Sequence, residues 1–300
     1  MLTEFKSILK LTPDETHSFA NFIKNQRKEL IPSTKETVNK AIFTHKDEID
    51  ILLNNNNISK LIIELRELCY EQFLLEESKF NALILSTIAK EFNAPQTILR
   101  DINSNLYTFR HLSEEQFLQK VGHLFGKFAG CISPYIYQLC LSNTQSRRTR
   151  AGKVFEGIIY SLYEYYGFSY DSQKSIGKKV FSSLGLGKVV DSILPSAKAF
   201  SMYRNKTIVG SMKTTLRERW QEVVEEISRS NLPNIHLLTV DHNIPVSKAK
   251  QMSEHNIVLV VTRDVKQKTS LNKMHNIIDF EAYFTKEIPQ IMAYWRCNND

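Results

Sequence analysis

Apolar residues recur at every third or fourth position along most of the first 120 residues, a spacing typical of amphipathic helices. The segments 58–69 and 79–90 show this spacing most clearly. Glycine, which weakens helix interiors, is absent before position 122, and all ten glycines of the chain follow that point. The pattern predicts that the N-terminal half is mostly helical.

After Gly152 the pattern changes to short runs of β-branched residues that alternate with helical segments. The strand-like runs are 189–194, 207–212, 235–240 and 257–261, and the helical segments between them include 215–228 and 246–254. A strand, helix, strand order requires a crossover connection, so part of the sheet should be parallel. We therefore expect an α/β fold with two parts, a helical region over residues 1–140 and a core over residues 141–300.

Composition excludes several classes of protein. Of the 300 residues, 42% are hydrophobic and 24% are charged, as in ordinary globular chains. No apolar run reaches the roughly 18–20 residues of a membrane span, and residues 1–6 lack the apolar block of a signal peptide. Cys69, Cys131, Cys140 and Cys297 show no CxxC pairing, so neither a zinc site nor a disulfide framework is indicated. We expect a cytoplasmic protein with reduced cysteines and no membrane association.

The net charge of +7 is concentrated in one part of the chain. Residues 1–140 carry 16 Lys and Arg against 17 Asp and Glu, residues 141–230 carry 15 against 8, and residues 231–300 carry 8 against 7. The three differences are −1, +7 and +1, so the middle segment holds the whole excess. Such a segment favours a polyanionic partner, although a solvated basic face would have the same composition.

That basic segment contains three residues suited to phosphodiester hydrolysis. Asp191 lies in one strand-like run, Lys213 closes the next, and Glu226 follows 13 residues later on a predicted helix. The reaction needs carboxylates that hold a metal ion and a cation that orients or activates the attacking water. Asp191 and Glu226 are suitable ligands for Mg²⁺, and Lys213 supplies the cation. Each residue taken alone is also consistent with an ordinary surface position.

The predicted helix after Lys213 carries side chains that can read bases. Thr214 and Thr215 are good N-cap residues, and a helix N-terminus there would present free N–H groups to phosphate. Arg217, Glu218 and Arg219 follow on the first turns. Arginine matches guanine bidentately and a carboxylate accepts from cytosine, so this triplet can read G·C pairs in a major groove. A salt-bridged helix face is the alternative interpretation.

Upstream, four cations occur within seven residues, followed by a glutamate. Arg147, Arg148, Arg150 and Lys153 are candidates for contacts with phosphates or a groove of DNA. Glu156 is three residues beyond Lys153, so both would lie on one helix face and Glu156 would add a third carboxylate near the metal. An exposed turn without a partner is the alternative for the basic run.

These residues resemble a known family of enzymes. The chain is similar to the type II restriction endonucleases of the SsoII, PspGI and EcoRII group, which cut CCNGG or CCWGG sites and belong to the PD-(D/E)XK nuclease superfamily. The resemblance is strong over residues 144–230 and continues to about residue 295. The strings that carry it are Arg147-Arg148-Thr149-Arg150-Ala151-Gly152-Lys153 with Glu156, Gly185-Leu186-Gly187-Lys188-Val189-Val190-Asp191, and Lys213-Thr214-Thr215-Leu216-Arg217-Glu218-Arg219-Trp220 with Glu226.

The resemblance implies a restriction-endonuclease-like mixed sheet and a Mg²⁺-dependent homodimer that cuts double-stranded DNA at a short interrupted palindrome. Cleavage before the first C would leave 5′ overhangs of five nucleotides. It further implies that a cognate cytosine methyltransferase protects the same site in the host. By position, the catalytic residues would be Asp191, Lys213 and Glu226, with Glu156 as the additional acidic one.

The recognition residues carry over in the same way. Arg217, Glu218 and Arg219 would read the CC/GG half-site, and Gln145 would contact the centre of the site from the minor groove. The group also flips the central base pair into pockets that contain aromatic residues. In this chain Phe92, Tyr107 and Phe109 are candidates for the stacking ring, and the region 1–140 would handle the central base pair, contact DNA and form the dimer.

Two departures from the superfamily pattern bear on catalysis. Val190 occupies the position usually held by proline, and Ser211 occupies the position usually held by a glutamate two residues before the lysine. Glu226 on the following helix can return a carboxylate to the same place, as in the rearranged motif of the CCNGG group. Two other interpretations stay open, a less specific metal-dependent DNA nuclease of repair or mobile elements, and a catalytically silent DNA-binding protein.

Overall fold

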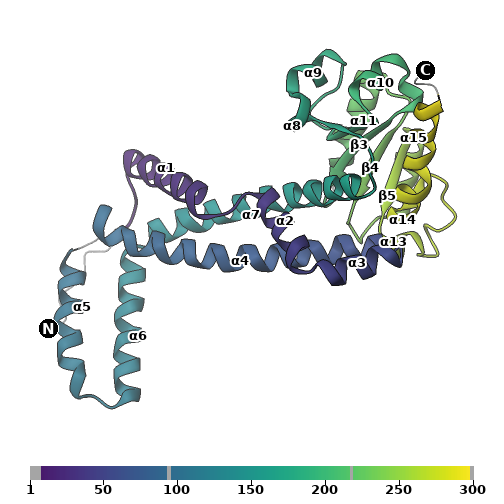
Figure 1. Cartoon of the computed structure of the whole chain (residues 1–300). Coiled ribbons are helices and arrows are strands. Elements are labelled where there is room, and N and C mark those ends of the chain that lie inside the picture. Colours follow the sequence, from purple (N-terminus) through teal and green to yellow (C-terminus); the bar gives the residue numbers. More distant parts are fainter. Residues whose placement is uncertain (1–7, 93–95, 217–218, 298–300) are drawn as a thin grey trace. The chain divides into compact units, whose positions relative to one another are not determined.

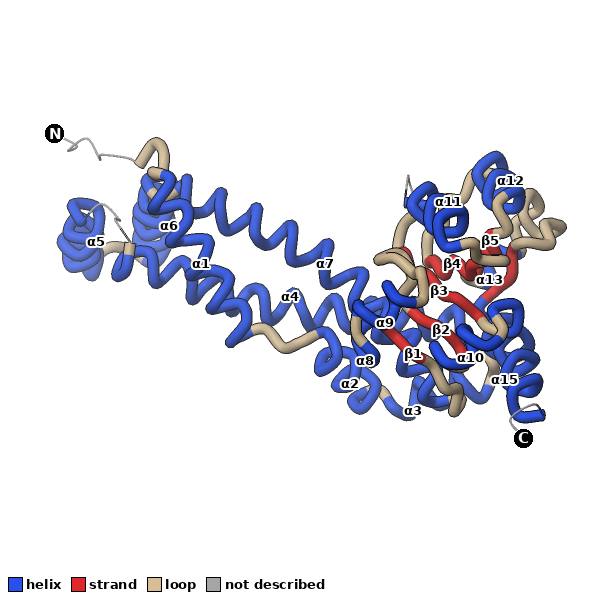
Figure 2. The backbone as a smooth tube through the Cα atoms, turned by 90° about the horizontal axis from the view of Figure 1, so that it is seen from above, coloured by secondary structure: helices blue, strands red, loops and turns tan. Residues whose placement is uncertain are grey.

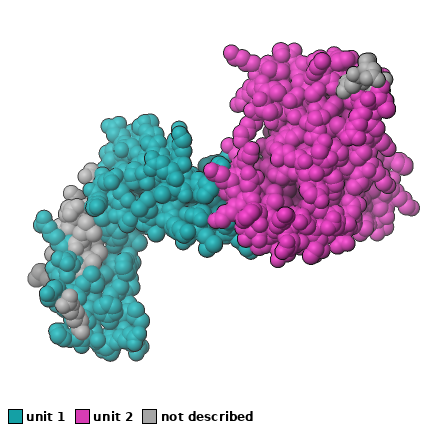
Figure 3. Space-filling model, in the orientation of Figure 1, with its two compact units in different colours: residues 1–33, 71–149 teal, residues 34–70, 150–300 magenta. Residues whose placement is uncertain are grey.

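The computed structural model describes residues 8–92, 96–216 and 219–297. They form two compact units, coloured separately in Figure 3. Unit 1 comprises residues 1–33 and 71–149, and unit 2 comprises residues 34–70 and 150–300. The division differs from the expected boundary near residue 140, because residues 34–70 pack with the C-terminal core and add to its hydrophobic interior.

Unit 1 is helical. It contains α1 (Pro13–Leu30), α5 (Gln96–Thr108), η1 (Phe109–His111), α6 (Glu114–Cys131) and parts of the long helices α4 (Ile58–Glu91) and α7 (Ser133–Tyr165), which also enter unit 2. The periodic segments 58–69 and 79–90 are thus two parts of one 34-residue helix. Phe19 lies at the centre of the unit's core, with its ring centroid 4.8 Å from that of Tyr135 and 5.0 Å from that of Phe92. The prediction of a mostly helical N-terminal half is confirmed.

Unit 2 is built on a six-stranded mixed sheet with the strands in sequence order (Figures 1 and 2). The strands are β1 (Asp171–Ser172), β2 (Ser192–Leu194), β3 (Ile208–Lys213), β4 (Ile235–Thr239), β5 (Ile257–Val261) and β6 (Ile277–Asp279). The pairs β1–β2 and β2–β3 are antiparallel, and the pairs from β3 to β6 are parallel. The expected α/β fold with a partly parallel sheet is confirmed.

Helices cover both faces of this sheet. One face packs on α2 (Thr34–Thr44), α3 (Lys46–Asn54), α4, α7, α14 (Phe280–Ala282), η3 (Tyr283–Glu287) and α15 (Ile288–Cys297). The other side carries α8 (Gln173–Ile176), α9 (Lys178–Ser183), α10 (Ala197–Met202), α11 (Arg219–Ser230), α12 (Val246–Glu254) and α13 (Arg263–Lys266). The short helix η2 (Arg204–Lys206) contacts α15, since Trp295 Nε1 donates to the carbonyl of Lys206. Strand residues alternate between the two cores, since Ile208 and Met212 join the first core and Val209 joins the second.

Several predicted boundaries differ from the observed ones, and the starts of β2 and α11 differ most. The run 189–194 is a strand only from Ser192, because the carbonyl of Val189 accepts a hydrogen bond from the Ser211 hydroxyl and does not enter the ladder. The helix expected from Thr215 begins at Arg219. Thr214 and Thr215 therefore do not cap it, and the described residues 214–216 form no helix N-terminus that could present N–H groups to phosphate. The N–H of buried Leu216 is instead donated to the carboxylate of Asp241, over 2.9 Å.

Candidate active site

Asp191 and Lys213 meet at one end of the antiparallel pair formed by β2 and β3. The register pairs Ser192 with Gly210, which brings the residue before β2 next to the last residues of β3. The backbone N–H of Met212 donates to Asp191 Oδ2 over 2.6 Å, and Lys213 Nζ lies 3.4 Å from the same oxygen. Both charged side chains are largely buried. The pair predicted from sequence spacing is thus formed in the structure.

Glu156 adds a second carboxylate to this pair from the middle of α7. Burial, followed by the negative charge of Asp191, raises the pKa of Glu156 to about 7, while Lys213 and Lys153 oppose the rise. Burial also raises the pKa of Asp191, against the effects of Lys213 and of the Met212 N–H group. One turn further along α7, the Tyr160 hydroxyl donates to the backbone carbonyl of Asp191 over 2.9 Å. Helix α7 therefore supports Asp191 and presents Glu156 beside it.

The two carboxylates form a site whose electrostatics suit a cation. Each pKa is raised because a buried negative charge is costly, and the charge of Asp191 adds to the rise at Glu156. A divalent ion bound by oxygen ligands would remove this penalty. Among the described residues, no group of three or more His, Cys, Asp and Glu side chains gathers to hold a metal. The structure therefore brings together Asp191, Glu156 and Lys213, and it does not place Glu226 in the same cluster.

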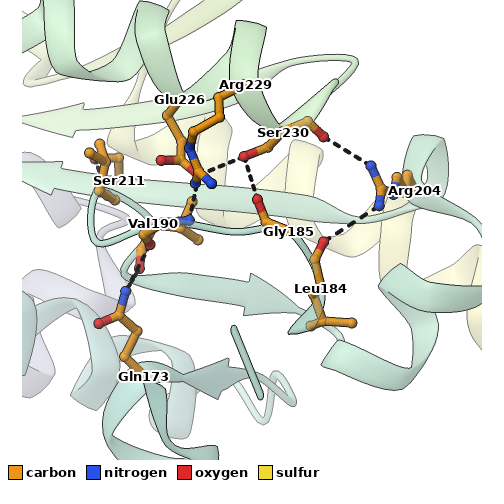
Figure 4. A network of polar contacts seen from close by, with 11 residues as sticks. Gln173, Leu184, Gly185, Val190, Arg204, Ser211, Glu226, Arg229 and Ser230 are labelled. Atoms are coloured by element: carbon orange, nitrogen blue, oxygen red, sulfur yellow. Dashed lines mark hydrogen bonds and ion pairs between the residues drawn. The ribbon is translucent and has the colours of Figure 1, made fainter. Parts of the chain in front are cut away.

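Glu226 takes part in a separate network of hydrogen bonds (Figure 4). Its Oε1 accepts from the Gly187 N–H at 2.5 Å, from Arg229 at 2.8 Å and from the Ser230 hydroxyl at 2.7 Å. The Ser230 oxygen also lies 2.6 Å from the carbonyl oxygen of Gly185, and its single hydrogen can serve one acceptor at a time. All hydrogen bonds of Glu226 to the described residues fall on Oε1. The network ties α11 to the segment 184–190, which leads directly to Asp191.

The same segment is held from its other side by two uncharged side chains. The amide of Gln173 donates to the carbonyls of Gly187 and Val190, each over 3.0 Å. Figure 4 shows Gln173 pointing towards Val190. Ser211 donates to the Val189 carbonyl over 2.7 Å. At the position where the superfamily usually has a metal-binding glutamate, this chain thus has a residue that fixes the backbone two residues before Asp191.

The basic residues predicted for DNA contact lie on α7. Arg147 Nε donates to buried Glu77 over 2.9 Å within unit 1, and Arg150 donates to Thr37 over 3.0 Å within unit 2. Both guanidinium groups thus have partners within the protein. The side chains of Gln145, Arg148 and Lys153 are exposed to solvent. The run is helical, so the alternative of an exposed turn was wrong.

Part of the predicted base-reading triplet cannot be placed. Arg217 and Glu218 lie outside the described residues, and Arg219 is the first residue of α11. Among the candidates for a stacking ring, Phe92 packs in the core of unit 1 and Phe109 is buried, whereas Tyr107 is exposed. Of these three candidates, only Tyr107 presents its ring on the surface.

Comparison with known proteins identifies the family. The model of the EcoRII C-terminal family matches residues 109–284. The chain belongs to this family. It is 33% identical over 231 residues to the type II restriction enzyme SsoII of Shigella sonnei, covering 75% of this chain and 67% of that enzyme. The resemblance seen in the sequence is confirmed, and the chain is a type II restriction endonuclease.

Solved structures of related endonucleases share the fold. Metal-depleted Ecl18kI in complex with uncleaved, modified DNA is 28% identical, with a TM-score of 0.72 over 93% of this chain and 85% of that one. A PspGI complex with substrate DNA is 19% identical, with a TM-score of 0.61 over 90% of this chain and 96% of that one, and its likeness concerns the fold alone. In this endonuclease, no described helix combines the length and hydrophobicity of a membrane-spanning segment.

Sequence reasoning missed the residues that support the candidate site around Asp191. Tyr160, Gln173 and Ser230 bond to backbone carbonyls that are 31, 14 and 45 residues away in the chain. Tyr160 had one available signal, because it lies four residues after Glu156 and so shares a helix face with it. Gln173 and Ser230 had none, since no local pattern indicates a distant carbonyl as the partner of a polar side chain.

Proposed function

We propose that this endonuclease hydrolyses double-stranded DNA at a CCNGG- or CCWGG-like site in the presence of Mg²⁺. It cuts before the first C and leaves 5′ overhangs of five nucleotides. The observation that carries the proposal is the cluster of Asp191, Glu156 and Lys213, formed in a member of the EcoRII C-terminal family. The DNA complexes of the related Ecl18kI and PspGI support a double-stranded substrate.

Three carboxylates would hold the metal. Asp191 and Glu156 already form a buried acidic pair, and Glu226 would contribute Oε2, since its hydrogen bonds to described residues use Oε1. When bound, Mg²⁺ stabilises the charge that develops on the phosphate and lowers the pKa of a bound water. Lys213 lies beside Asp191 and orients or activates the attacking water. Tyr160, Gln173 and Ser211 keep the backbone of Asp191 in place.

Recognition is proposed for the residues on either side of this site. Arg217, Glu218 and Arg219 read the CC/GG half-site in the major groove, and Gln145 contacts the centre of the site from the minor groove. Arg148 and Lys153, both exposed on α7, bind the DNA backbone. Arg147 and Arg150 would add phosphate contacts to the bonds they already make with Glu77 and Thr37.

A palindromic site implies two copies of the chain. We propose a homodimer in which each subunit cuts one strand, because a two-fold symmetric protein matches the symmetry of its site. The region 1–140 contributes to the dimer, to DNA contact and to flipping of the central base pair. A cognate cytosine methyltransferase protects the host genome, and the endonuclease acts in the cytoplasm, where that genome is found.

Digestion of a plasmid of known sequence tests the proposal. The protein is incubated with Mg²⁺ or with EDTA, and the fragment ends are sequenced. Discrete cuts before the first C of CCNGG-like sites, formed only with Mg²⁺, are expected. Smeared products would replace the proposal with a less specific nuclease. Intact DNA from a plasmid that contains both CCAGG and CCGGG sites, with binding to the same sites, would indicate a silent DNA-binding protein.

A further inference from the structure

A second basic surface lies beside the active site and has no role in the function proposed above. We call residues 173–190, which comprise α8, α9 and the segment 184–190, the lysine lobe. The lysine lobe carries Lys174, Lys178, Lys179 and Lys188 and contains no acidic residue. All four lysines are exposed, and none of them belongs to an ion pair within the described part of the chain. Like charges gathered in this way favour a polyanion as the partner.

The topology attaches the lysine lobe to the catalytic end of the sheet. The lobe leaves β1 after Ser172, which pairs with Ser192, and it returns to the chain at Asp191. Figure 2 shows α8 and α9 beside β1 and β2. The two bonds from the Gln173 amide close the base of the lobe. Lys188 is therefore only three residues from the catalytic aspartate, and the other lysines lie on the helices directly before it.

The lysine lobe is also fixed in position. Phe181 and Leu186 are buried in the second core of unit 2. From the neighbouring elements, Ser230 lies 2.6 Å from the Gly185 carbonyl oxygen, and Arg204 donates to the Leu184 carbonyl over 3.4 Å (Figure 4). A charged surface on an ordered frame loses little backbone entropy when it binds, so its lysines can add to affinity.

The sheet order places α8 and α9 of the lysine lobe and the described residues 214–216 on different sides of the catalytic pair. The two helices adjoin β1 and β2, whereas residues 214–216 follow β3 on the way to β4, and among the described residues only the segment 184–190 of the lobe bonds to α11. Asp191 and Lys213 lie between them. A cut before the first C puts the scissile phosphate at the boundary between the recognition sequence and flanking DNA. If the proposed recognition residues, Arg217 to Arg219, face the recognition sequence on one side of that phosphate, the lysine lobe faces the flanking DNA on the other side.

We infer that the lysine lobe binds the phosphate backbone of duplex DNA outside the recognition sequence. The inference rests on the proposed function, because it uses the proposed position of the cut. Lysine is a flexible point charge that suits phosphate without base specificity, and the one amide of the lobe that could read a base, Gln173, is engaged with backbone carbonyls. The lobe thus adds affinity that depends on the length of the DNA and not on the sequence of the flank.

The test compares two double variants in the full-length protein. Lys178→Gln/Lys179→Gln removes two charges from the lysine lobe. Lys250→Gln/Lys273→Gln is the matched control, because both lysines are exposed. They lie towards the β6 edge of the sheet, since their neighbours Ala249 and Asn276 are hydrogen-bonded to each other there. Binding is measured by fluorescence anisotropy in EDTA on a short duplex that ends close to the mapped site and on a long duplex with about one more helical turn on each side.

The lobe variant should bind the long duplex more weakly than the parent at 0.1 M salt. The expected loss is about eightfold for each phosphate from which a lysine is removed, because affinity scales with salt to a power of about −0.9 per neutralised phosphate. The slope of log affinity against log salt should fall by about two for the double variant. The lobe variant should bind the short duplex as tightly as the parent protein does. The control variant should bind both duplexes as tightly as the parent does.

Equal losses on the short and long duplexes, or equal losses for the lobe and control variants, would overturn the inference and leave the proposed function intact. If the parent protein makes no discrete cuts in the plasmid digestion, the proposed function fails first. Thermal unfolding of both variants checks that the exposed substitutions leave the fold unchanged. The two failures are distinguishable, because the proposed function is tested with the parent protein alone and the inference about the lysine lobe is tested with the variants.

Discussion

Substitution of Glu226 by glutamine and by alanine separates two roles of this residue. Its carboxylate accepts hydrogen bonds from Gly187, Arg229 and Ser230, and it is 4% exposed. The structure therefore gives Glu226 a supporting role, while the proposed function makes it a ligand of the metal ion. Alanine removes both roles. Glutamine keeps the size of the side chain and an oxygen that accepts from Gly187, and it removes the charge.

The expected effects on stability follow from these contacts. Glu226→Ala leaves the Gly187 N–H and the Ser230 hydroxyl without this acceptor, and it should lower the free energy of unfolding by about 2–4 kcal/mol. Glu226→Gln loses chiefly the ion pair with Arg229, whose side chain is 57% exposed, so the loss should be about 1 kcal/mol or less. Equilibrium unfolding in urea, monitored by circular dichroism, measures both.

For cleavage, the glutamine variant is the more informative of the two, because its fold should stay close to that of the parent protein. Loss of a residue that only supports a metal ligand typically costs about 10–100-fold, so loss of a ligand should cost at least about 100-fold. We expect Glu226→Gln to fold almost as stably as the parent and to cut plasmid DNA at least about 100-fold more slowly in Mg²⁺ under single-turnover conditions. If Glu226→Gln cuts within about tenfold of the parent, Glu226 is a support for the segment 184–190 and not a metal ligand.

Four further predictions concern neighbouring residues. Asp191→Ala and Lys213→Ala should each abolish cleavage. Affinity for the target in a gel-shift assay should change by less than about tenfold, because phosphate and base contacts supply the affinity. Unchanged turnover in either variant would refute the assignment of that residue. Arg219→Ala should cost about 1–3 kcal/mol of discrimination at one guanine, and an equal loss on all sequences would make Arg219 a phosphate contact. Because the pKa of Glu156 is raised to about 7, its carboxyl group is mostly protonated at lower pH. Calorimetry should therefore show the affinity for Mg²⁺ rising as the pH increases towards 7, and Glu156→Gln should weaken this dependence, with the remainder due to Asp191. Gly187→Ala should destabilise the fold by about 1–3 kcal/mol in urea unfolding, because the added methyl group would clash with the Glu226 carboxylate and lie 2.5 Å from Arg229; wild-type stability would show that both side chains can move aside.

Local sequence determined most elements of this endonuclease and the grouping of Asp191 with Lys213. Hydrophobic periodicity located α12 and β5 at their observed bounds, because the spacing of apolar residues directly reports which face of a segment is buried. Asp191 and Lys213 could be grouped from the sequence, since Asp191 lies near the start of one strand-like run and Lys213 closes the next. An antiparallel pair of strands brings such a start and such an end together. The spacing between Lys153 and Glu156 and the resemblance to the family added Glu156.

Tertiary structure decided the partners of the polar side chains. Arg147 resembles a free cation in the sequence, yet Glu77, 70 residues away, binds it. Glu226 accepts from Gly187 at a separation of 39 residues, and Leu216 donates to Asp241 in place of starting a helix. Periodicity predicts burial within one segment, because burial depends on the segment's own apolar face. The partner of a buried charge depends on how distant segments pack, and that information is spread over the whole chain.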